Sequence, residues 1–145
     1  MPESTSHCTL LAFDFGLKQI GSAVGQTLTA SASPLTVIRA RDGQPDWNHI
    51  QALIAEWRPA LLLVGLPLNM DGTESDFCAR ARKFARRLNG RFALPVKMVD
   101  ERLSTREAKE RGGYRESFRD NPVDNLAAQV ILESWLNNPG DTREP

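Results

Sequence analysis

Three acidic residues stand where separate segments of the chain change from one expected element to the next. Asp14 ends an apolar run, Glu101 follows a second apolar run, and Asp124 opens an apolar helical pattern. Carboxylates brought together from distant segments can hold Mg²⁺, a hard cation that takes oxygen ligands. Two such ions can drive displacement at a phosphodiester. The three acids therefore predict a metal-dependent nuclease.

Each acid also has an ordinary structural interpretation. Asp14 suits a turn, Glu101 can form a surface pair with Arg102, and Asp124 can cap a helix. Asp100 precedes Glu101, and successive residues of a strand point to opposite sides of the sheet. The sequence therefore leaves open which of these two neighbouring acids faces the site.

The apolar patterns predict the elements that must position these acids. Strands are expected over Thr9–Phe15, Ile20–Gln26, Ser33–Arg39, Leu61–Leu66 and Pro95–Val99. Helices are expected over Asp46–Trp57 and Asp124–Leu136. A third helix lies between them, and we expect it to begin at a capping box formed by Thr73 and Asp76 and to stop at Gly90. A further short helix is expected to begin over Thr105–Lys109. The main order, β-β-β-α-β-α-β-α, predicts an α/β fold with a mixed five-stranded sheet flanked by helices. The first, fourth and fifth strands would be parallel, and an open α/β sheet places its site at the carboxyl ends of such strands.

Length and composition favour one ordinary globular domain. The chain has 145 residues, of which 41% are hydrophobic and 25% charged, and this predicts a single domain over 9–137 with flexible termini at 1–8 and 138–145. No apolar run approaches the roughly 18 residues of a membrane span, and no export signal is visible, so we expect a cytoplasmic protein. Cys8 and Cys78 are expected to be reduced, and His7 and His49 provide no zinc ligand set.

Positive charge is concentrated although the net charge is zero. The segment 80–91 contains no acid, and Arg80, Lys83 and Arg87 fall on one stripe of its helix, which predicts a phosphate-binding surface as readily as a solvated helix face. The segment 102–119 carries Arg102, Arg111 and Arg115, with Tyr114 able to stack on a base, although a plain flexible loop explains it nearly as well. Asn69, in the connector 65–73, could contact phosphate or simply belong to a turn.

Several motifs together resemble the YqgF family. The resemblance rests on Asp14-Phe15-Gly16 with Ile20-Gly21, on Val64-Gly65-Leu66-Pro67-Leu68-Asn69-Met70-Asp71-Gly72-Thr73, on Asp100-Glu101-Arg102-Leu103-Ser104-Thr105, and on Asp124 followed by Leu126-Ala127-Ala128. It covers about residues 9–137, and the middle two motifs are specific. Members are bacterial Holliday-junction-resolvase-like proteins, also described as pre-16S rRNA nucleases. The resemblance implies a ribonuclease H-like fold.

The resemblance also implies roles for particular residues. By position, the family's catalytic and metal-binding acids match Asp14, Glu101 and Asp124, and Lys18 could supply the basic residue that often follows the first acid. The implied reaction is phosphodiester hydrolysis by water activated on Mg²⁺ or Mn²⁺, with one or two ions. Gln19 replaces a common Arg or Ser of the family, and the segment from Glu107 to Gly112 is shorter than in many relatives.

The leading interpretation is 5′-end processing of pre-16S rRNA on ribosomal precursor particles. The alternatives are a resolvase of branched DNA, for which a symmetric dimer would be needed, and a ribosome-assembly or nucleic-acid-binding factor without catalysis. We expect a monomer or a weak homodimer. A sugar-kinase-like phosphotransferase is disfavoured, because that fold clamps its nucleotide between two domains and this chain supplies one.

Overall fold

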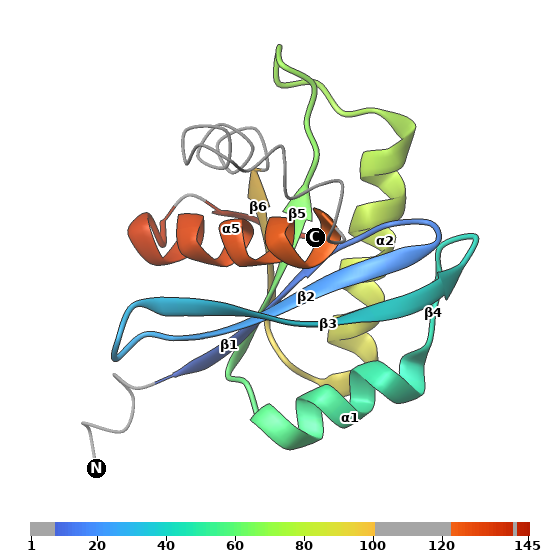
Figure 1. The fold of residues 1–145 in the computed structure, drawn as a ribbon. Coiled ribbons are helices and arrows are strands. Elements are labelled where there is room, and N and C mark those ends of the chain that lie inside the picture. Colours follow the sequence, from blue (N-terminus) through green and yellow to red (C-terminus); the bar gives the residue numbers. More distant parts are fainter. Residues whose placement is uncertain (1–7, 101–122, 141) are drawn as a thin grey trace.

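A single mixed sheet organises the molecule. The computed structural model describes residues 8–100, 123–140 and 142–145, and its strands lie in the order β4-β3-β2-β1-β5-β6-β7 (Figure 1). The strands are β1 (Thr9–Asp14), β2 (Gln19–Gln26), β3 (Ser31–Arg41), β4 (Gln44–Pro45), β5 (Leu61–Leu66), β6 (Val96–Asp100) and β7 (Thr142–Arg143). β1, β5 and β6 run parallel, whereas β2, β3, β4 and β7 pair antiparallel with their neighbours. The predicted mixed α/β sheet is confirmed, with all five expected strands in place.

Two short strands were not predicted. β4 follows β3 through the two-residue turn Asp42–Gly43, whose φ angles are 49° and 82°. Positive φ at both central residues is the geometry of a type I′ hairpin turn, for which Asp-Gly is a favoured sequence. β7 pairs with Met98 and Val99 of β6. Thr142 and Arg143, in the segment expected to be a flexible terminus, thus lie in a strand of the sheet.

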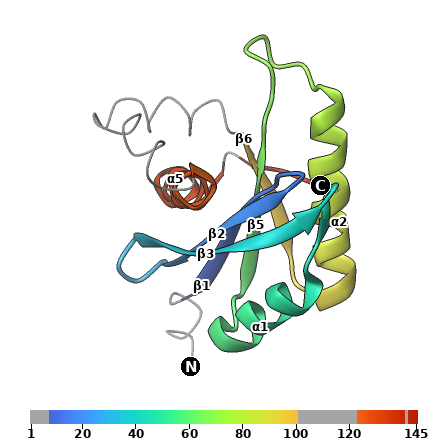
Figure 2. The ribbon, with the colours of Figure 1, turned by 45° about the vertical axis from the view of Figure 1, so that its right-hand side comes forward.

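Helices cover both faces of the sheet. They are α1 (Trp47–Trp57), α2 (Asp76–Phe92) and α5 (Val123–Asn137). Figures 1 and 2 show α1 and α2 on one face and α5 on the other. α1 begins as predicted, because the Asp46 carboxylate accepts a hydrogen bond from the backbone N–H of His49 at 3.3 Å. It ends at Arg58, which has a left-handed backbone conformation.

The predicted ends of α2 need correction. The N-cap is Ser75, which makes no side-chain capping bond, so the expected capping box of Thr73 and Asp76 is wrong. Thr73 instead bonds within the preceding turn, where its hydroxyl donates to Asp71. Gly90 lies inside the helix, which continues to a left-handed cap at Ala93. Local turn hydrogen bonds, rather than the spacing of capping residues, therefore set where this helix starts.

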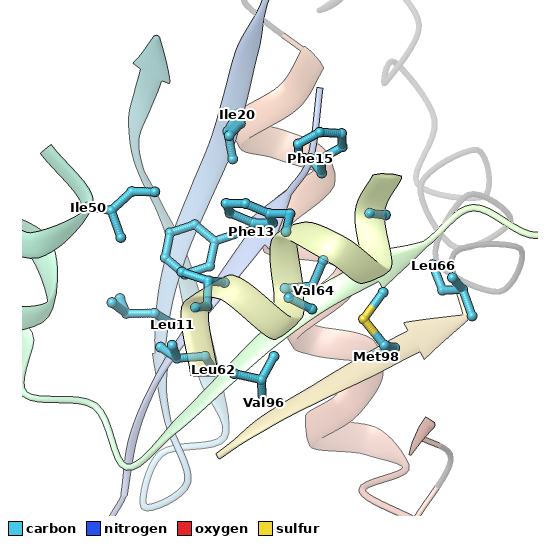
Figure 3. Close-up of a cluster of buried hydrophobic side chains, with 14 of the residues drawn as sticks. Leu11, Phe13, Phe15, Ile20, Ile50, Leu62, Val64, Leu66, Val96 and Met98 are labelled. Carbon is cyan, nitrogen blue, oxygen red and sulfur yellow. The ribbon is translucent and has the colours of Figure 1, made fainter. Parts of the chain in front are cut away.

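Alternate residues of β1 enter two separate hydrophobic cores. Leu11 and Phe13, together with Phe15 just after the strand, belong to the larger core beneath α1 and α2 (Figure 3). Leu10 and Ala12 belong to the smaller core beneath α5. The predicted apolar faces of α2 and α5 are confirmed by the burial of Ala81, Phe84, Ala85, Leu88, Ala128, Ile131 and Leu132. In the described part of the chain, no helix is both long and apolar enough to cross a membrane.

Candidate active site

Asp14 ends the central strand of the sheet on the face covered by α5. It is the last residue of β1 and is half-buried. Side chains of a strand alternate between faces, and Leu10 and Ala12 both pack in the core beneath α5. Asp14 therefore points to the same side as these two residues. Its position at the carboxyl end of a parallel strand is where open α/β sheets bind ligands.

Glycines flank Asp14 on both neighbouring strands. Asp14 pairs directly with Gly21 of β2. On the other side, β1 and β5 pair up to Phe13 and Val64, so the next step of the register puts Asp14 beside Gly65. Glycine inside a strand often marks a position where a ligand or another backbone approaches closely. At both directly paired positions, therefore, the residue beside Asp14 is a glycine, which carries no side chain.

Asp100 lies on the other face of the sheet. It is the last residue of β6 and pairs with Leu66 of β5. In a strand its side chain points to the same face as those of Val96 and Met98, and both of these belong to the core beneath α1 and α2. Asp100 therefore points away from the side of Asp14. This disfavours Asp100 as the partner of Asp14, whereas Glu101 lies outside the described residues.

The predicted geometry of the parallel strands is confirmed. β5 separates β1 from β6, so the ends of β1 and β6 are two strand spacings apart, about 9–10 Å. α5 lies on the Asp14 side of the sheet, and Asp124 falls in its first turn. The amino-terminal end of a helix carries partial positive charge, which favours anionic groups there. The side chains of residues 123–125 lie outside the described part.

A tight turn holds Lys18 close to the end of β1. A Cβ on Gly16 would be 2.3 Å from the carbonyl oxygen of Gln19, so the turn requires glycine. The carbonyls of Leu17 and Lys18 accept hydrogen bonds from Gly43 and Ala40, each at 2.9 Å. The backbone of the turn is therefore fixed against the β3–β4 hairpin, while the Lys18 side chain is exposed.

The connector from β5 to α2 extends beyond the carboxyl end of the sheet (Figures 1 and 2). Its turn is closed by hydrogen bonds from Asn69 N–H to the carbonyl of Thr73 and from Gly72 N–H to the carbonyl of Asn69, both at 2.8 Å. The Asn69 amide also donates to the Thr73 hydroxyl, so part of its donor capacity is used inside the loop. Met70 is 81% exposed.

Three predicted basic residues come together on α2. Arg80, Lys83 and Arg87 line one pocket, on the face opposite to Asp14. The sequence interpretation missed the Asp42–Gly43 turn that completes this pocket, although the Asp-Gly pair could have indicated it. The predicted nucleic-acid contacts Arg102, Arg111, Tyr114 and Arg115, and the short helix expected from Thr105, lie outside the described residues.

No metal-binding cluster is formed by the described residues alone. Within them, no group of three or more histidine, cysteine, aspartate or glutamate side chains could hold an ion. Only one of the three predicted ligands, Asp14, has a described side chain. The carboxylate of Asp14, beside two glycines, has the donor chemistry that Mg²⁺ prefers.

The fold is that of known resolvases. The structure of Thermus thermophilus RuvC in complex with a Holliday junction substrate aligns with a TM-score of 0.57 over 94% of this chain and 99% of that chain, at 14% identity. The fowlpox virus Holliday junction resolvase aligns with a TM-score of 0.51 over 90% and 99%, at 9% identity. At these identities the likeness shows the fold alone, a ribonuclease H-like sheet as predicted.

Sequence comparison shows the family. The family model described as "RuvX: Holliday junction resolvase" matches residues 8–138, and the chain belongs to this family. A Pseudomonas putida protein named "Putative pre-16S rRNA nuclease" is 60% identical over 131 residues, 88% of this chain and 93% of that protein. A Haemophilus ducreyi protein of the same name is 56% identical over 134 residues, 90% of this chain and 96% of that protein. The resemblance to the YqgF family and the predicted enzyme class, a phosphodiester-hydrolysing nuclease, are confirmed.

Proposed function

We propose that the protein is a metal-dependent nuclease that processes the 5′ end of pre-16S rRNA. The observation that carries the chemistry is the position of Asp14, at the carboxyl end of the central strand, between Gly21 and Gly65 and on the α5 face. The rRNA substrate is supported by the names of relatives 56–60% identical to this chain. It implies action in the cytoplasm, on ribosomal precursor particles.

The proposed metal ligands are Asp14, Glu101 and Asp124. They come from the end of β1, from the residue after β6 and from the first turn of α5. Asp100 points to the opposite face, which supports Glu101 as the ligand from the end of β6. Bound Mg²⁺ or Mn²⁺ would activate water and stabilise charge on the phosphate. The spacing between β1 and β6, about 9–10 Å, is compatible with one ion as readily as with two.

The remaining proposed contacts hold the substrate. Lys18 is exposed on a turn whose backbone is fixed beside Asp14, so its ammonium group can pair with a phosphate near the scissile bond without reorganising the turn. Asn69 lies on the connector that extends beyond the same end of the sheet. We assign Arg102, Arg111, Tyr114 and Arg115 to contacts with the nucleic-acid strand further from the cleaved bond, with Tyr114 stacking on a base.

The alternative with specific support is resolution of branched DNA. It rests on the description of the matching family and on the fold shared with RuvC. A resolvase needs a symmetric dimer that places two sites on two strands, whereas an rRNA nuclease can act as a monomer or a weak homodimer. The names of the more similar relatives favour rRNA, and the substrate test below separates the two functions.

The test compares two substrates and two proteins. End-labelled precursor 16S rRNA leader and a synthetic four-way DNA junction are incubated with wild type and with Asp14→Asn, in Mg²⁺, in Mn²⁺ and in EDTA. Metal-dependent RNA cleavage that Asp14→Asn abolishes is the expected result. Symmetric nicking of the junction alone would instead identify a resolvase. Tight binding of RNA without cleavage in any metal would overturn the catalytic role of Asp14 on these substrates and favour a non-catalytic assembly factor.

A further inference from the structure

A cationic pocket lies between α2 and the Asp42–Gly43 turn. Its volume is about 330 Å³, and its lining includes Arg80, Lys83, Arg87 and a single acid, Asp42. Three positive charges against one negative charge give the pocket a positive potential, although the whole chain has a net charge of zero. Local basic surface of this kind attracts phosphate groups.

Arg87 is held in place before any ligand binds. Its guanidinium carbon is 5.1 Å from the ring centroid of Trp47, a cation–π arrangement. One guanidinium N–H also donates to the Gln44 side-chain oxygen at 2.9 Å. A guanidinium has five N–H donors in a fixed geometry, so further donors remain for a phosphate. The ordering of this side chain does not have to be supplied by the ligand, which favours binding.

Arg80 and Lys83 are available to an anion. Among the described residues, Arg80 forms an ion pair with Asp42, whose carboxylate oxygen is 3.7 Å away, and the two side chains are 52% and 83% exposed. An exposed ion pair of this kind contributes little, so a phosphate can displace the carboxylate at low cost. Lys83 forms no ion pair with any described residue.

The pocket lies close to Asp14 along the chain but on the other face of the sheet. Phe15 lines the pocket, whereas Asp14 points to the α5 side. The turn that carries Lys18 follows directly and is bonded to the hairpin that forms the pocket wall. A nucleic-acid strand that contacts both this pocket and Asp14 must therefore pass around the carboxyl end of β1 and over this turn.

We propose that this pocket binds phosphates of the nucleic-acid backbone that flank the cleaved bond. The pocket offers point charges and a guanidinium fork, which suit phosphate oxygens rather than particular bases. It is thus a sequence-independent second contact that bends the substrate around the end of β1. The proposal rests on the proposed function for its ligand, but binding in the pocket requires neither the metal nor Asp14.

The test measures binding of a fluorescein-labelled single-stranded RNA by anisotropy, in EDTA, over a series of salt concentrations. The variant Arg80→Gln/Lys83→Gln is compared with Arg58→Gln/Arg86→Gln, which removes the same charge from exposed arginines outside the pocket. Each lost contact with a single strand lowers the salt slope by about 0.7, so the pocket variant should lose about 1.4 and the control far less. Asp42→Asn, which removes the acid from the pocket, should bind RNA several-fold more tightly.

Equal loss of slope in the two double variants would overturn the proposal, because non-specific charge alone would then explain binding. A second result would also overturn the proposal. Inorganic phosphate would saturate the pocket of the wild type in NMR titrations, while the salt slope of RNA binding by Arg80→Gln/Lys83→Gln would equal that of the wild type. Thermal melts verify that the variants fold. If Arg80→Gln/Lys83→Gln does not fold, the single variant Lys83→Gln is used in its place. Cleavage by wild type is scored separately, so an inactive enzyme with the expected slopes would contradict the proposed function and leave the pocket intact.

Discussion

Gly25 of β2 lies directly against Leu132 of α5. A Cβ on Gly25 would be 2.2 Å from the Cδ2 atom of Leu132 and 2.7 Å from the carbonyl oxygen of Ser31. Contacts below 3.0 Å force the surroundings to move, and a carbonyl of the neighbouring strand cannot move without disturbing the sheet. This close approach sets the distance between α5 and the sheet. It thereby also sets how far the first turn of α5, which carries Asp124, lies from the sheet.

Replacing Gly25 by alanine should displace α5. We expect Gly25→Ala to destabilise the fold by about 1–3 kcal/mol, as overpacking does, and to reduce nuclease activity more than its effect on folding explains. Chemical denaturation measures the first effect and cleavage at a temperature well below unfolding measures the second. Gly90→Ala is the control: a Cβ there meets nothing within 4 Å, so this helical position should gain about 0.5–1 kcal/mol. Equal stability of Gly25→Ala and wild type would contradict the argument.

A side chain at Gly65 should obstruct the space beside Asp14. Gly65→Ala puts a methyl group on the α5 face next to the carboxylate, where a metal ion or substrate is proposed to bind. We expect cleavage to fall about tenfold or more, because small displacements of reacting groups are costly. Isothermal titration with Mn²⁺ tests whether the metal or the substrate is excluded. Wild-type cleavage by a folded Gly65→Ala protein would show that this space is not used.

The turn from Asn69 to Thr73 should lose order without Asp71. One carboxylate oxygen of Asp71 accepts from the Thr73 N–H at 3.0 Å and from its hydroxyl at 2.6 Å. We expect Asp71→Ala to change global stability by less than about 1 kcal/mol, since these bonds are exposed. Backbone NMR order parameters for residues 69–73 should fall nevertheless. Unchanged order parameters would mean that the backbone bonds alone hold the turn.

Arg82 connects α2 to the carboxyl-terminal segment. It forms a two-point ion pair with Glu74, with distances of 2.9 and 2.6 Å, and donates to the carbonyl of Glu144 at 2.7 Å. Glu144 in turn pairs with Lys97 of β6. The hydrogen bond from Arg82 lowers the pKa of Glu74 below its ordinary value. Through Arg82, the protonation state of Glu74 is thereby linked to the position of β7.

The pairing of β7 should therefore weaken in acid. A carboxylate whose pKa is lowered by folding contributes its stabilisation above its unfolded pKa, and this contribution is lost as pH falls through the folded value. We expect the amide chemical shifts of Thr142 and Arg143 to change with pH below the ordinary titration range of glutamate. In Glu74→Gln the same shifts should not follow this titration. A pH response that persists in Glu74→Gln would show that Glu74 is not its source.

The sequence was sufficient for most of the architecture, because the signals there are long. The apolar runs of β1, β5 and β6 and the helical stripes of α2 and α5 predicted both the parallel strands and the two packing faces. Two-residue strands such as β4 and β7 are too short to produce a periodic pattern. The end of α2 was misplaced because Gly90, a common stop signal, faces open space and the helix tolerates it.

The site was predicted only in part, for a different physical reason. The identity of Asp14 and the adjacent motif were visible in the sequence, but its two glycine neighbours come from separate strands and depend on register. The same holds for the pocket. Helical spacing places Arg80, Lys83 and Arg87 on one stripe of α2. The contacts of Arg80 with Asp42 and of Arg87 with Gln44, however, depend on how the β3–β4 hairpin packs on α2. Contacts distant in sequence are not encoded in local patterns.

The position of β7 has a consequence for the behaviour of the protein at high concentration. β6 would otherwise present unpaired N–H and C=O groups along one border of the sheet, and such borders promote aggregation by strand addition. β7 occupies part of that border at Met98 and Val99 and is held there through Arg82 and Lys97. The short strand thus acts as a cover against self-association, and conditions that release it should favour intermolecular β-sheet before the rest of the fold is lost.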